Sequence, residues 1–184
     1  SDRKLVSRTN NALNRMNTFR KFVDLNNLCD IGCGEGVFLD VLSKNDYTNI
    51  IGIEPNAQAV NFARSKGFEV YEGKLNKFPE LARNHNIHAA TMLHVIEHLE
   101  DPLGSLKMVH GGLGQGGYLV LETPDMNSFS LKAASYKHSL ICEDHLFYFS
   151  EKSLKKILEK TGFKVIAFGK RDFDQYNFGI RESL

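Results

Sequence analysis

The stretch L-C-D-I-G-C-G-E-G, from Leu28 to Gly36, decides the fold. The apolar residues up to Ile31 predict a short strand, and three glycines follow before an apolar, helix-like segment begins at Val37. Glycine lets the backbone turn sharply and lets a ligand approach without meeting a side chain. A ligand at such a turn also meets the free N–H groups at the start of the next helix. The pattern alone also fits an ordinary tight turn between a strand and a helix, so the segments around it decide.

A second predicted strand, N-I-I-G-I-E from Asn49 to Glu54, supports a nucleotide site. Its continuous apolar run is typical of a strand buried on both faces. Glu54 ends it roughly 20 residues beyond the glycines, where an acid can accept hydrogen bonds from both hydroxyls of a ribose. In the nicotinamide fingerprint G-x-G-x-x-G/A the third glycine would stand at Val37, and Gly36 comes one residue too early. Two classes of cofactor site combine a glycine turn with an acid at the end of the second strand. The spacing here disfavours the nicotinamide class and therefore favours the second one.

Predicted strands and helices alternate along the chain. The strands are Asn27–Ile31, Asn49–Glu54, Phe68–Tyr71, Ile87–Leu93, Tyr118–Glu122, Phe163–Gly169 and Phe173–Phe178. The helices are Asn10–Val23, Val37–Ser43, Asn56–Lys66, Lys77–Arg83, Pro102–His110 and Glu151–Lys160. Such alternation predicts a parallel sheet with helices on both faces. Only Lys170 to Asp172 separate the last two strands, and a parallel pair needs a crossover of about a dozen residues, so this pair must be antiparallel. We therefore expect an α/β, Rossmann-like fold with a seven-stranded, mostly parallel sheet and an antiparallel last strand.

Length and composition fit one globular domain. The chain has 184 residues, 42% of them hydrophobic and 24% charged, without an internal repeat or a linker. This is enough for a single domain with a sizeable core, so we expect residues 1–184 to form one domain. Residues 125–149 are its one long irregular stretch. Loops of that length are usually lids or binding loops, so we expect a lid or acceptor-binding insert there.

Charge and cysteine content disfavour several classes of protein. A net charge of +1 argues against a general nucleic-acid binder. No apolar run approaches the roughly 18 residues of a membrane span. The cysteines, Cys29, Cys33 and Cys142, are too few for a disulfide framework, which favours a reducing compartment. We therefore expect a cytoplasmic protein that does not bind nucleic acid and does not span a membrane.

With these segments in place, the chain resembles class I S-adenosylmethionine-dependent methyltransferases. Four ordered motifs carry the resemblance: the glycine stretch, I-G-I-E-P at 51–55, L-H-V-I-E-H-L-E-D-P at 93–102 and G-Q-G-G-Y-L-V-L-E-T-P at 114–124. The segment H-L-F-Y-F-S-E-K-S-L at 145–154 is similar to the tail of a branch with many small-molecule, sugar and ubiquinone-pathway O-methyltransferases. The resemblance covers nearly the whole chain from about Leu25 onward. The fold it implies agrees with the antiparallel hairpin argued above.

The resemblance implies S-adenosylmethionine as the cofactor. The positions that match the family's cofactor-binding residues are Asp30, Gly32, Cys33, Gly34, Gly36, Glu54, Pro55, Leu75, Leu93 and His94. Two positions depart from the family pattern: Lys74 stands where many relatives have an acid for the adenine amine, and His88 stands where they often have Asp. These departures keep open a non-catalytic module that retains the fold without methylating anything.

Methyl transfer needs alignment first and a base second. Alignment can supply effective molarities of about 10⁵ to 10⁸ M. A general base adds roughly 10² to 10⁴ if the acceptor must lose a proton, and histidine suits that role. His94, at the carboxyl end of a parallel strand, and His145, after the insert, are the candidate catalytic residues. The alternatives are a wall of the cofactor pocket for His94 and a tether of the lid for His145.

The spacing of His94, Glu97 and His98 would place all three on one face of a helix, which also suits a metal ion. Some ubiquinone-pathway relatives carry E-x-x-E-H there and are metal-assisted, but this chain has His94 in place of the first acid. We expect no metal. The whole sequence predicts methyl transfer to a small-molecule acceptor such as a sugar or phenol, at oxygen, by a monomer or homodimer. The less favoured alternative is a nicotinamide-dependent oxidoreductase.

Overall fold

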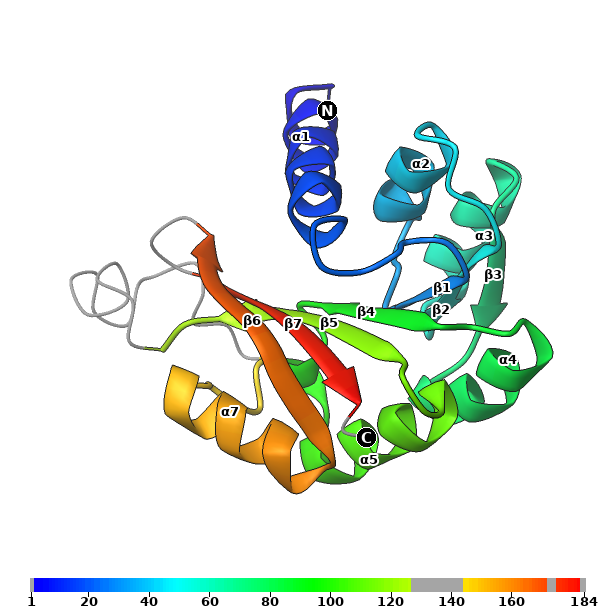
Figure 1. Cartoon of the computed structure of the whole chain (residues 1–184). Helices are drawn as coiled ribbons and strands as arrows, with labels where there is room; N and C mark the ends of the chain where they lie inside the picture. Colours follow the sequence, from blue (N-terminus) through cyan, green and yellow to red (C-terminus); the bar gives the residue numbers. More distant parts are fainter. Residues whose placement is uncertain (1, 127–143, 172–174, 183–184) are drawn as a thin grey trace.

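The computed structural model describes residues 2–126, 144–171 and 175–182, with only the backbone of 2, 170–171 and 175–182 (Figure 1). Its strands are β1 (Leu28–Ile31), β2 (Ile50–Glu54), β3 (Glu69–Glu72), β4 (Ala89–Leu93), β5 (Tyr118–Pro124), β6 (Phe163–Arg171) and β7 (Gln175–Glu182). They form one sheet in the order β3-β2-β1-β4-β5-β7-β6. The five strands β1 to β5 pair in parallel, and β7 pairs antiparallel with both β5 and β6. The expected α/β, mostly parallel arrangement is thereby confirmed.

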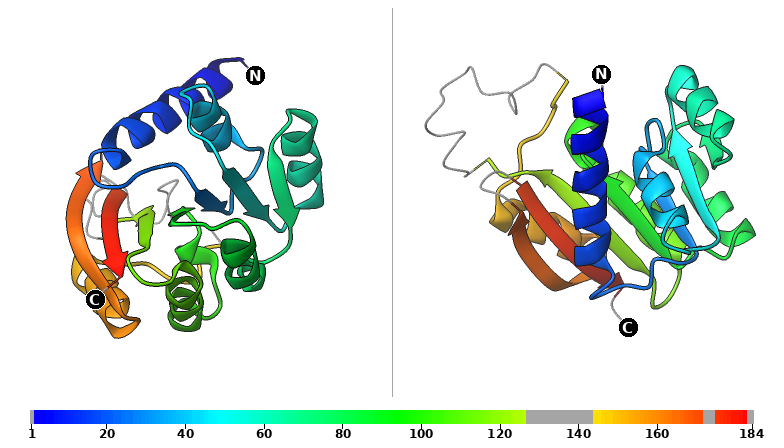
Figure 2. Two further views of the ribbon diagram at one scale, coloured as in Figure 1. Left: turned by 45° about the vertical axis from the view of Figure 1, so that its right-hand side comes forward. Right: turned by 90° about the horizontal axis from the view of Figure 1, so that it is seen from above.

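Helices cover both faces of the sheet, as the alternation of elements predicts (Figures 1 and 2). One face carries α1 (Asp2–Phe19), α2 (Val37–Ser43) and α3 (Ala57–Ser65). The other carries α4 (Phe78–Asn84), α5 (Pro102–Leu113) and α7 (Glu151–Lys160). Two short 3-10 turns, η1 (Leu75–Lys77) and η2 (Ile96–His98), follow β3 and β4.

Each face of the sheet has its own core. On one side Met16 and Phe19 of α1 pack with Phe38 of α2 against β1 and β4. On the other, Phe78 of α4 and Leu106 of α5 belong to a larger cluster that continues to α7 and β6. Burial of such large side chains contributes about 1.5–3 kcal/mol each, so the sheet is fixed from both sides.

The first helix differs from the prediction at both ends: the apolar spacing predicts Asn10–Val23, and α1 spans Asp2–Phe19. Of the apolar residues at this spacing, Met16, Phe19 and Val23 are buried, Leu13 is half-buried and Phe22 is exposed, so the prediction identifies most of the buried face. The first two turns carry no such pattern, since Leu5 and Val6 are exposed, and no apolar period therefore marks them in the sequence.

Two further predictions concern the second half of the chain. Lys170 and Arg171 are predicted in the turn of the last hairpin, but both belong to β6; residues 172–174 lie outside the described part. Most of the expected insert, 125–149, also falls outside it, because residues 127–143 are not described. Its two ends are joined: Asp125 forms a parallel bridge with Phe149, and the N–H of Met126 donates to the carbonyl of Phe149 at 3.0 Å. Among the described helices, none has the length and apolar character to cross a membrane.

Candidate functional site

The turn between β1 and α2 is fixed by hydrogen bonds and by left-handed glycines. The N–H groups of Gly32 and Cys33 donate to the carbonyl of Ile53 on β2, at 2.8 and 3.2 Å. Gly32 has a φ of 77°, and a Cβ there would lie 2.5 Å from Cγ2 of Val95. Gly36, the N-cap of α2, has a φ of 75°. Only glycine adopts such angles readily, so the turn presents backbone rather than side chains.

Glu54 ends β2 beside this turn. Its Oε2 accepts from the N–H of Gly34 and its Oε1 from the N–H of Asn56, both at 2.9 Å. An ionised carboxylate has about four acceptor positions. The carboxylate is therefore held in place by backbone donors and keeps acceptor capacity for a diol.

Two cavities flank the turn, and Gly32 lines both. The larger, of about 440 Å³, lies toward β2 and η1, with Pro55 and Leu75 in its wall. The smaller, of about 220 Å³, lies between the turn and α1, with Arg15 and Asp30 in its wall. The pair forms a space on both sides of the glycines, as an elongated ligand lying across the carboxyl ends of the strands requires.

Asp30 is buried at the floor of the smaller cavity. The hydroxyl of Thr91 on β4 donates to its Oδ1 at 2.6 Å. Burial raises the pKa of Asp30 to about 7, although the bond from Thr91 and the charge of Arg15 oppose this rise. A cation placed beside Asp30 would favour the ionised carboxylate, so this position suits a ligand ammonium group.

His94 follows β4 in a left-handed conformation, with a φ of 58°. Its N–H donates to the carbonyl of Glu122 at 2.8 Å. Its Nε2 lies 3.0 Å from Oε1 of Glu122, and its Nδ1 lies 3.3 Å from Oε1 of Glu97. Burial alone would lower the pKa of His94, but the hydrogen bonds to Glu122 and Glu97 outweigh it and raise the pKa to about 9. At neutral pH His94 is therefore an imidazolium, which donates protons in hydrogen bonds rather than accepting one.

An ion pair between α1 and β5 is absent from the sequence-based predictions. Nε of Arg15 donates to Oε1 and Oε2 of Glu122 at 3.1 and 3.0 Å, and Nη2 donates to Oε1. Burial alone would raise the pKa of Glu122, but the bonds from His94 and Arg15 outweigh it and lower the pKa to about 2. In the sequence, the feature that points to this ion pair on β5 is an acid inside the apolar strand Y-L-V-L-E-T-P. For α1 the signal is the helical spacing of Arg8, Asn11 and Arg15, all of which line the smaller cavity.

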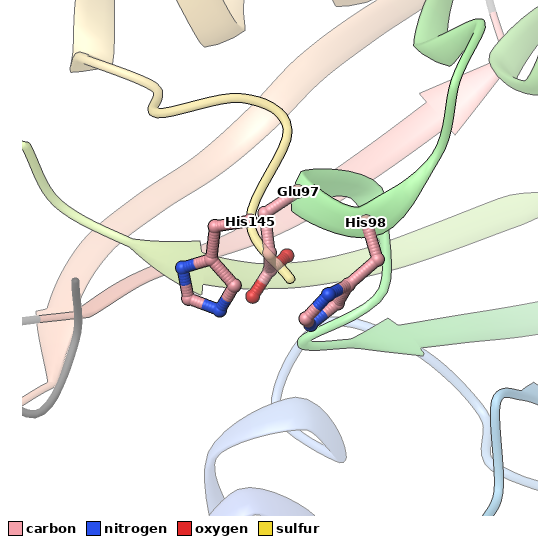
Figure 3. A group of neighbouring side chains, drawn as sticks. All are labelled: Glu97, His98 and His145. Carbon is pink, nitrogen blue, oxygen red and sulfur yellow. The ribbon is translucent and has the colours of Figure 1, made fainter. Parts of the chain in front are cut away.

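The side chains of Glu97, His98 and His145 form a cluster just beyond His94 (Figure 3). One donor atom from each lies within 4.8 Å of the others. The described C-terminal end of the insert is attached to η2, because the N–H groups of Leu146 and Phe147 donate to the carbonyl of Glu97 at 2.8 and 3.1 Å. This attachment brings His145 to the end of β4, far from it in sequence.

The prediction that His94, Glu97 and His98 share one face of a helix is wrong. Residues 96–98 form a 3-10 turn that His94 precedes with its left-handed backbone, and the cluster contains His145 in place of His94. Nδ1 of His98 lies 2.8 Å from the carbonyl of Asp144, a contact that requires Nδ1 to carry the proton and leaves Nε2 as an acceptor. Two imidazoles and a carboxylate are a donor set that suits a divalent transition metal, and the bond to Asp144 is the kind that orients a metal-binding histidine.

The cavities bring most of the predicted cofactor-binding residues together. The smaller one is lined by Asp30, Gly32, Cys33, Gly34 and Leu93, and the larger one by Gly32, Pro55 and Leu75. Glu54 and Gly36 lie at the turn itself, and His94 follows Leu93. Of the two departures, Lys74 lines the larger cavity. His88 packs against Tyr118 at the opposite end of β4, with ring centroids 5.5 Å apart, and is remote from the turn.

The family model of the methyltransferase domain matches residues 5–167, nearly the whole chain. The chain belongs to this methyltransferase family. Its sequence is 23% identical over 148 residues to the ubiquinone biosynthesis O-methyltransferase of Aliivibrio fischeri, a match that covers 73% of the chain and 62% of that protein. The chain spans less than two thirds of the curated relatives that it matches, 62% of this one and 31% of another.

Solved methyltransferases share the fold at low sequence identity. A methyltransferase of Thermotoga maritima, described as a possible histamine N-methyltransferase, has a TM-score of 0.75 and 20% identity, over 99% of this chain and 94% of that one. Magnesium protoporphyrin IX methyltransferase from Synechocystis, with bound S-adenosylhomocysteine, has a TM-score of 0.74 and 16% identity, over 97% and 84%. By sequence the chain thus belongs to the methyltransferase family, and it shares its fold with solved S-adenosylmethionine-dependent methyltransferases.

Proposed function

We propose that this chain transfers a methyl group from S-adenosylmethionine to a hydroxyl group of a small molecule, with residues 125–149 shaping the acceptor site. The observation that carries the proposal is the pair of cavities on either side of Gly32, with Glu54 at the turn between them. The histidines His94 and His145 then lie beyond the end of β4, where the acceptor would meet the cofactor. Oxygen as the acceptor atom is supported by the named activity of the Aliivibrio relative.

The two cavities differ in a way that fits the two ends of the cofactor. The larger has apolar walls suited to adenine, and Glu54 would accept from the ribose hydroxyls. The smaller combines the guanidinium of Arg15 with the carboxyl of Asp30, which matches the carboxylate and the ammonium of an amino acid. Cys33, Gly34 and Leu93 would line the methionine chain, and Pro55 and Leu75 the adenosine.

When bound, S-adenosylmethionine supplies an electrophilic methyl group on a positive sulfur. The protein's part is alignment, with proton removal where the acceptor needs it. We assign proton removal to His145, which stacks edge-on with His98 and Tyr148 at centroid distances of 4.7 and 5.6 Å. Both ring nitrogens of His94 are engaged, by Glu122 and by Glu97, so we assign His94 to the wall of the site at the end of β4 rather than to proton removal.

A metal-assisted version of the same reaction is the second candidate. It is favoured by the donor cluster of Glu97, His98 and His145. In that version His145 would bind the ion and could not also accept the proton. Acceptors compatible with either version are sugars and phenols. We further propose one domain, a monomer or homodimer, and a cytoplasmic location, which the free, buried thiols of Cys29 and Cys33 support.

The deciding experiment is calorimetric titration with S-adenosylmethionine, S-adenosylhomocysteine and a nicotinamide dinucleotide, followed by an acceptor screen with a radiolabelled methyl group. We expect the first two to bind and a phenol or sugar to become labelled at oxygen. Cofactor binding without labelling of any acceptor would favour the non-catalytic module. Binding of the dinucleotide alone would overturn the proposal.

A further inference from the structure

Glu122 on β5 stands between the two parts of the site. Its side chain is fully buried, and its Oε1 receives bonds from Arg15, which lines the smaller cavity. The same oxygen lies 3.0 Å from Nε2 of His94. One carboxylate oxygen therefore joins a cation of the cofactor pocket to the histidine at the end of β4.

Glu122 holds the backbone of His94 as well as its ring. The N–H of His94 donates to the carbonyl of Glu122 at 2.8 Å. A φ of 58° is uncommon for a residue with a side chain and persists only where the surroundings enforce it. Because Glu122 contacts both the backbone N–H and the ring of His94, a displacement of Glu122 would move the whole of His94.

The guanidinium of Arg15 is shared between Glu122 and the cavity. Its bonds to Glu122 use Nε and Nη2, which leaves Nη1 to reach a ligand carboxylate. In a buried site, charges that share a partner influence one another strongly, because water does not screen them. A second carboxylate on Arg15 therefore competes with Glu122 for the same cation.

We propose that Glu122 is a positioning residue that couples the carboxylate end of the cofactor pocket to His94. When a ligand carboxylate binds Arg15, the attraction between Arg15 and Glu122 changes. This change alters the two hydrogen bonds of Glu122 with His94, one to its backbone N–H and one to its ring. Such coupling is reciprocal, so a change at His94 also alters affinity for the carboxylate-bearing ligand. The inference rests on the proposed function, since it takes the smaller cavity as the methionine subsite.

Two ligands separate the coupling from simple occupancy. S-adenosylhomocysteine carries the amino-acid carboxylate, whereas 5′-methylthioadenosine has the same adenosine without it. The readout is the ring signal of His94 in NMR spectra of the full chain with ¹³C-labelled histidine, assigned with His94→Gln. We expect S-adenosylhomocysteine to shift this signal and 5′-methylthioadenosine to bind without shifting it. Glu122→Gln should abolish the shift, and Glu122→Asp, which retains the charge, should restore part of it.

A second variant keeps the test independent of Glu122. Arg15→Gln removes the proposed carboxylate contact and leaves Glu122 with His94. It should weaken S-adenosylhomocysteine binding about tenfold to hundredfold, the usual effect of losing a charged hydrogen bond, and leave 5′-methylthioadenosine binding unchanged. Glu151→Gln, which breaks a half-buried pair with Lys155 on α7, is the control and should change the affinity for neither ligand.

The outcomes distinguish the two ideas. Equal shifts of His94 with both ligands, or an unchanged shift in Glu122→Gln, would overturn the coupling while leaving the cofactor pocket in place. If neither ligand binds the wild-type protein, the proposed function fails and the coupling falls with it.

Discussion

The charges that define the site belong to a few residues with distinct partners. Glu54 is held at the turn by backbone N–H groups, and Asp30 is buried under the hydroxyl of Thr91. Arg15 and Glu122 pair between α1 and β5. Each charge is thus anchored before a ligand arrives, and pre-ordered groups bind without the entropic cost of being ordered by the ligand.

Replacement of Glu54 tests the ribose contact. Glu54→Ala removes a charged acceptor, so we expect the affinity for S-adenosylhomocysteine to fall by about 1.5–3 kcal/mol. Calorimetry measures this directly. Glu80→Ala, an exposed acid in the first turn of α4, is the matched control. Unchanged affinity in Glu54→Ala would show that the ribose lies elsewhere.

Replacement of His145 tests the assigned base. His145→Ala should lower turnover of an identified acceptor by roughly 10² to 10⁴, the usual contribution of a general base. Its affinity for S-adenosylhomocysteine should stay the same, because His145 does not line either cavity. His88→Ala, an exposed histidine at the opposite end of β4, should affect neither quantity. Normal turnover in His145→Ala would exclude it as the base.

At the scale of elements, α7 begins directly after the segment that holds His145. Ser150 caps it: the side chain accepts from the N–H of Ser153, whose own side chain accepts from the N–H of Ser150. Leu154 and Leu158 then bury the helix against the core. The cap therefore fixes where the segment 145–149 ends and the helix begins.

Removal of this cap should lower the free energy of unfolding and leave methyl transfer unchanged. We expect Ser150→Ala to lower the free energy of unfolding by about 1 kcal/mol, the typical value of an N-cap. Urea denaturation followed by circular dichroism measures it. Lys152→Ala, an exposed position in the same turn, is the comparison and should fall within about 0.5 kcal/mol of wild type.

The elements are more predictable from the sequence than the histidine cluster. Helices α2 and α7 have the predicted bounds, because a glycine and a serine mark their starts. Strand ends such as Glu54 are predictable too, since parallel strands end at one edge of a sheet. The contact of His145 with His98 is not, because it depends on the hydrogen bonds from residues 146 and 147 to Glu97. The pairing of Arg15 with Glu122 likewise depends on how α1 lies across β5.

On the scale of the whole molecule, buried charge makes stability depend on pH. Burial raises the pKa of Asp30 from its ordinary value of 3.8 to about 7 in the folded protein. The folded state therefore holds more protons than the unfolded state between these values, and stability must fall as pH rises through this range. The pKa of His94, which its two carboxylate partners raise from 6.5 to about 9, extends the fall to more alkaline pH.

Urea denaturation at a series of pH values checks this. The lowered pKa of Glu122 adds stability as pH rises through its ordinary value of 4.5 and opposes the effect of Asp30 there. We therefore expect the free energy of unfolding to decrease from about pH 5.5 to 7, with a slope of at most about 1.4 kcal/mol per pH unit from Asp30. Asp30→Asn has no titrating carboxyl and should remove that slope. A slope that persists in Asp30→Asn would assign it to other groups.

Metal removal separates the two versions of the reaction. If His145 is the base, dialysis against a chelator should leave methyl transfer unchanged, and elemental analysis should find no stoichiometric metal. Loss of activity that Mn²⁺ or Zn²⁺ restores would instead support the cluster of Glu97, His98 and His145 as an ion site. Glu97→Gln should then abolish the restoration.

The bridge between Asp125 and Phe149, with its bond from Met126, has a consequence for the evolution of such enzymes. The bridge joins the two ends of the intervening segment to each other next to the end of β5. The entropy of closing a loop grows only with the logarithm of its length, so segments of many lengths could be exchanged there at little cost. On the proposal that residues 125–149 shape the acceptor site, exchange of this segment between relatives should change acceptor preference and leave cofactor binding unchanged.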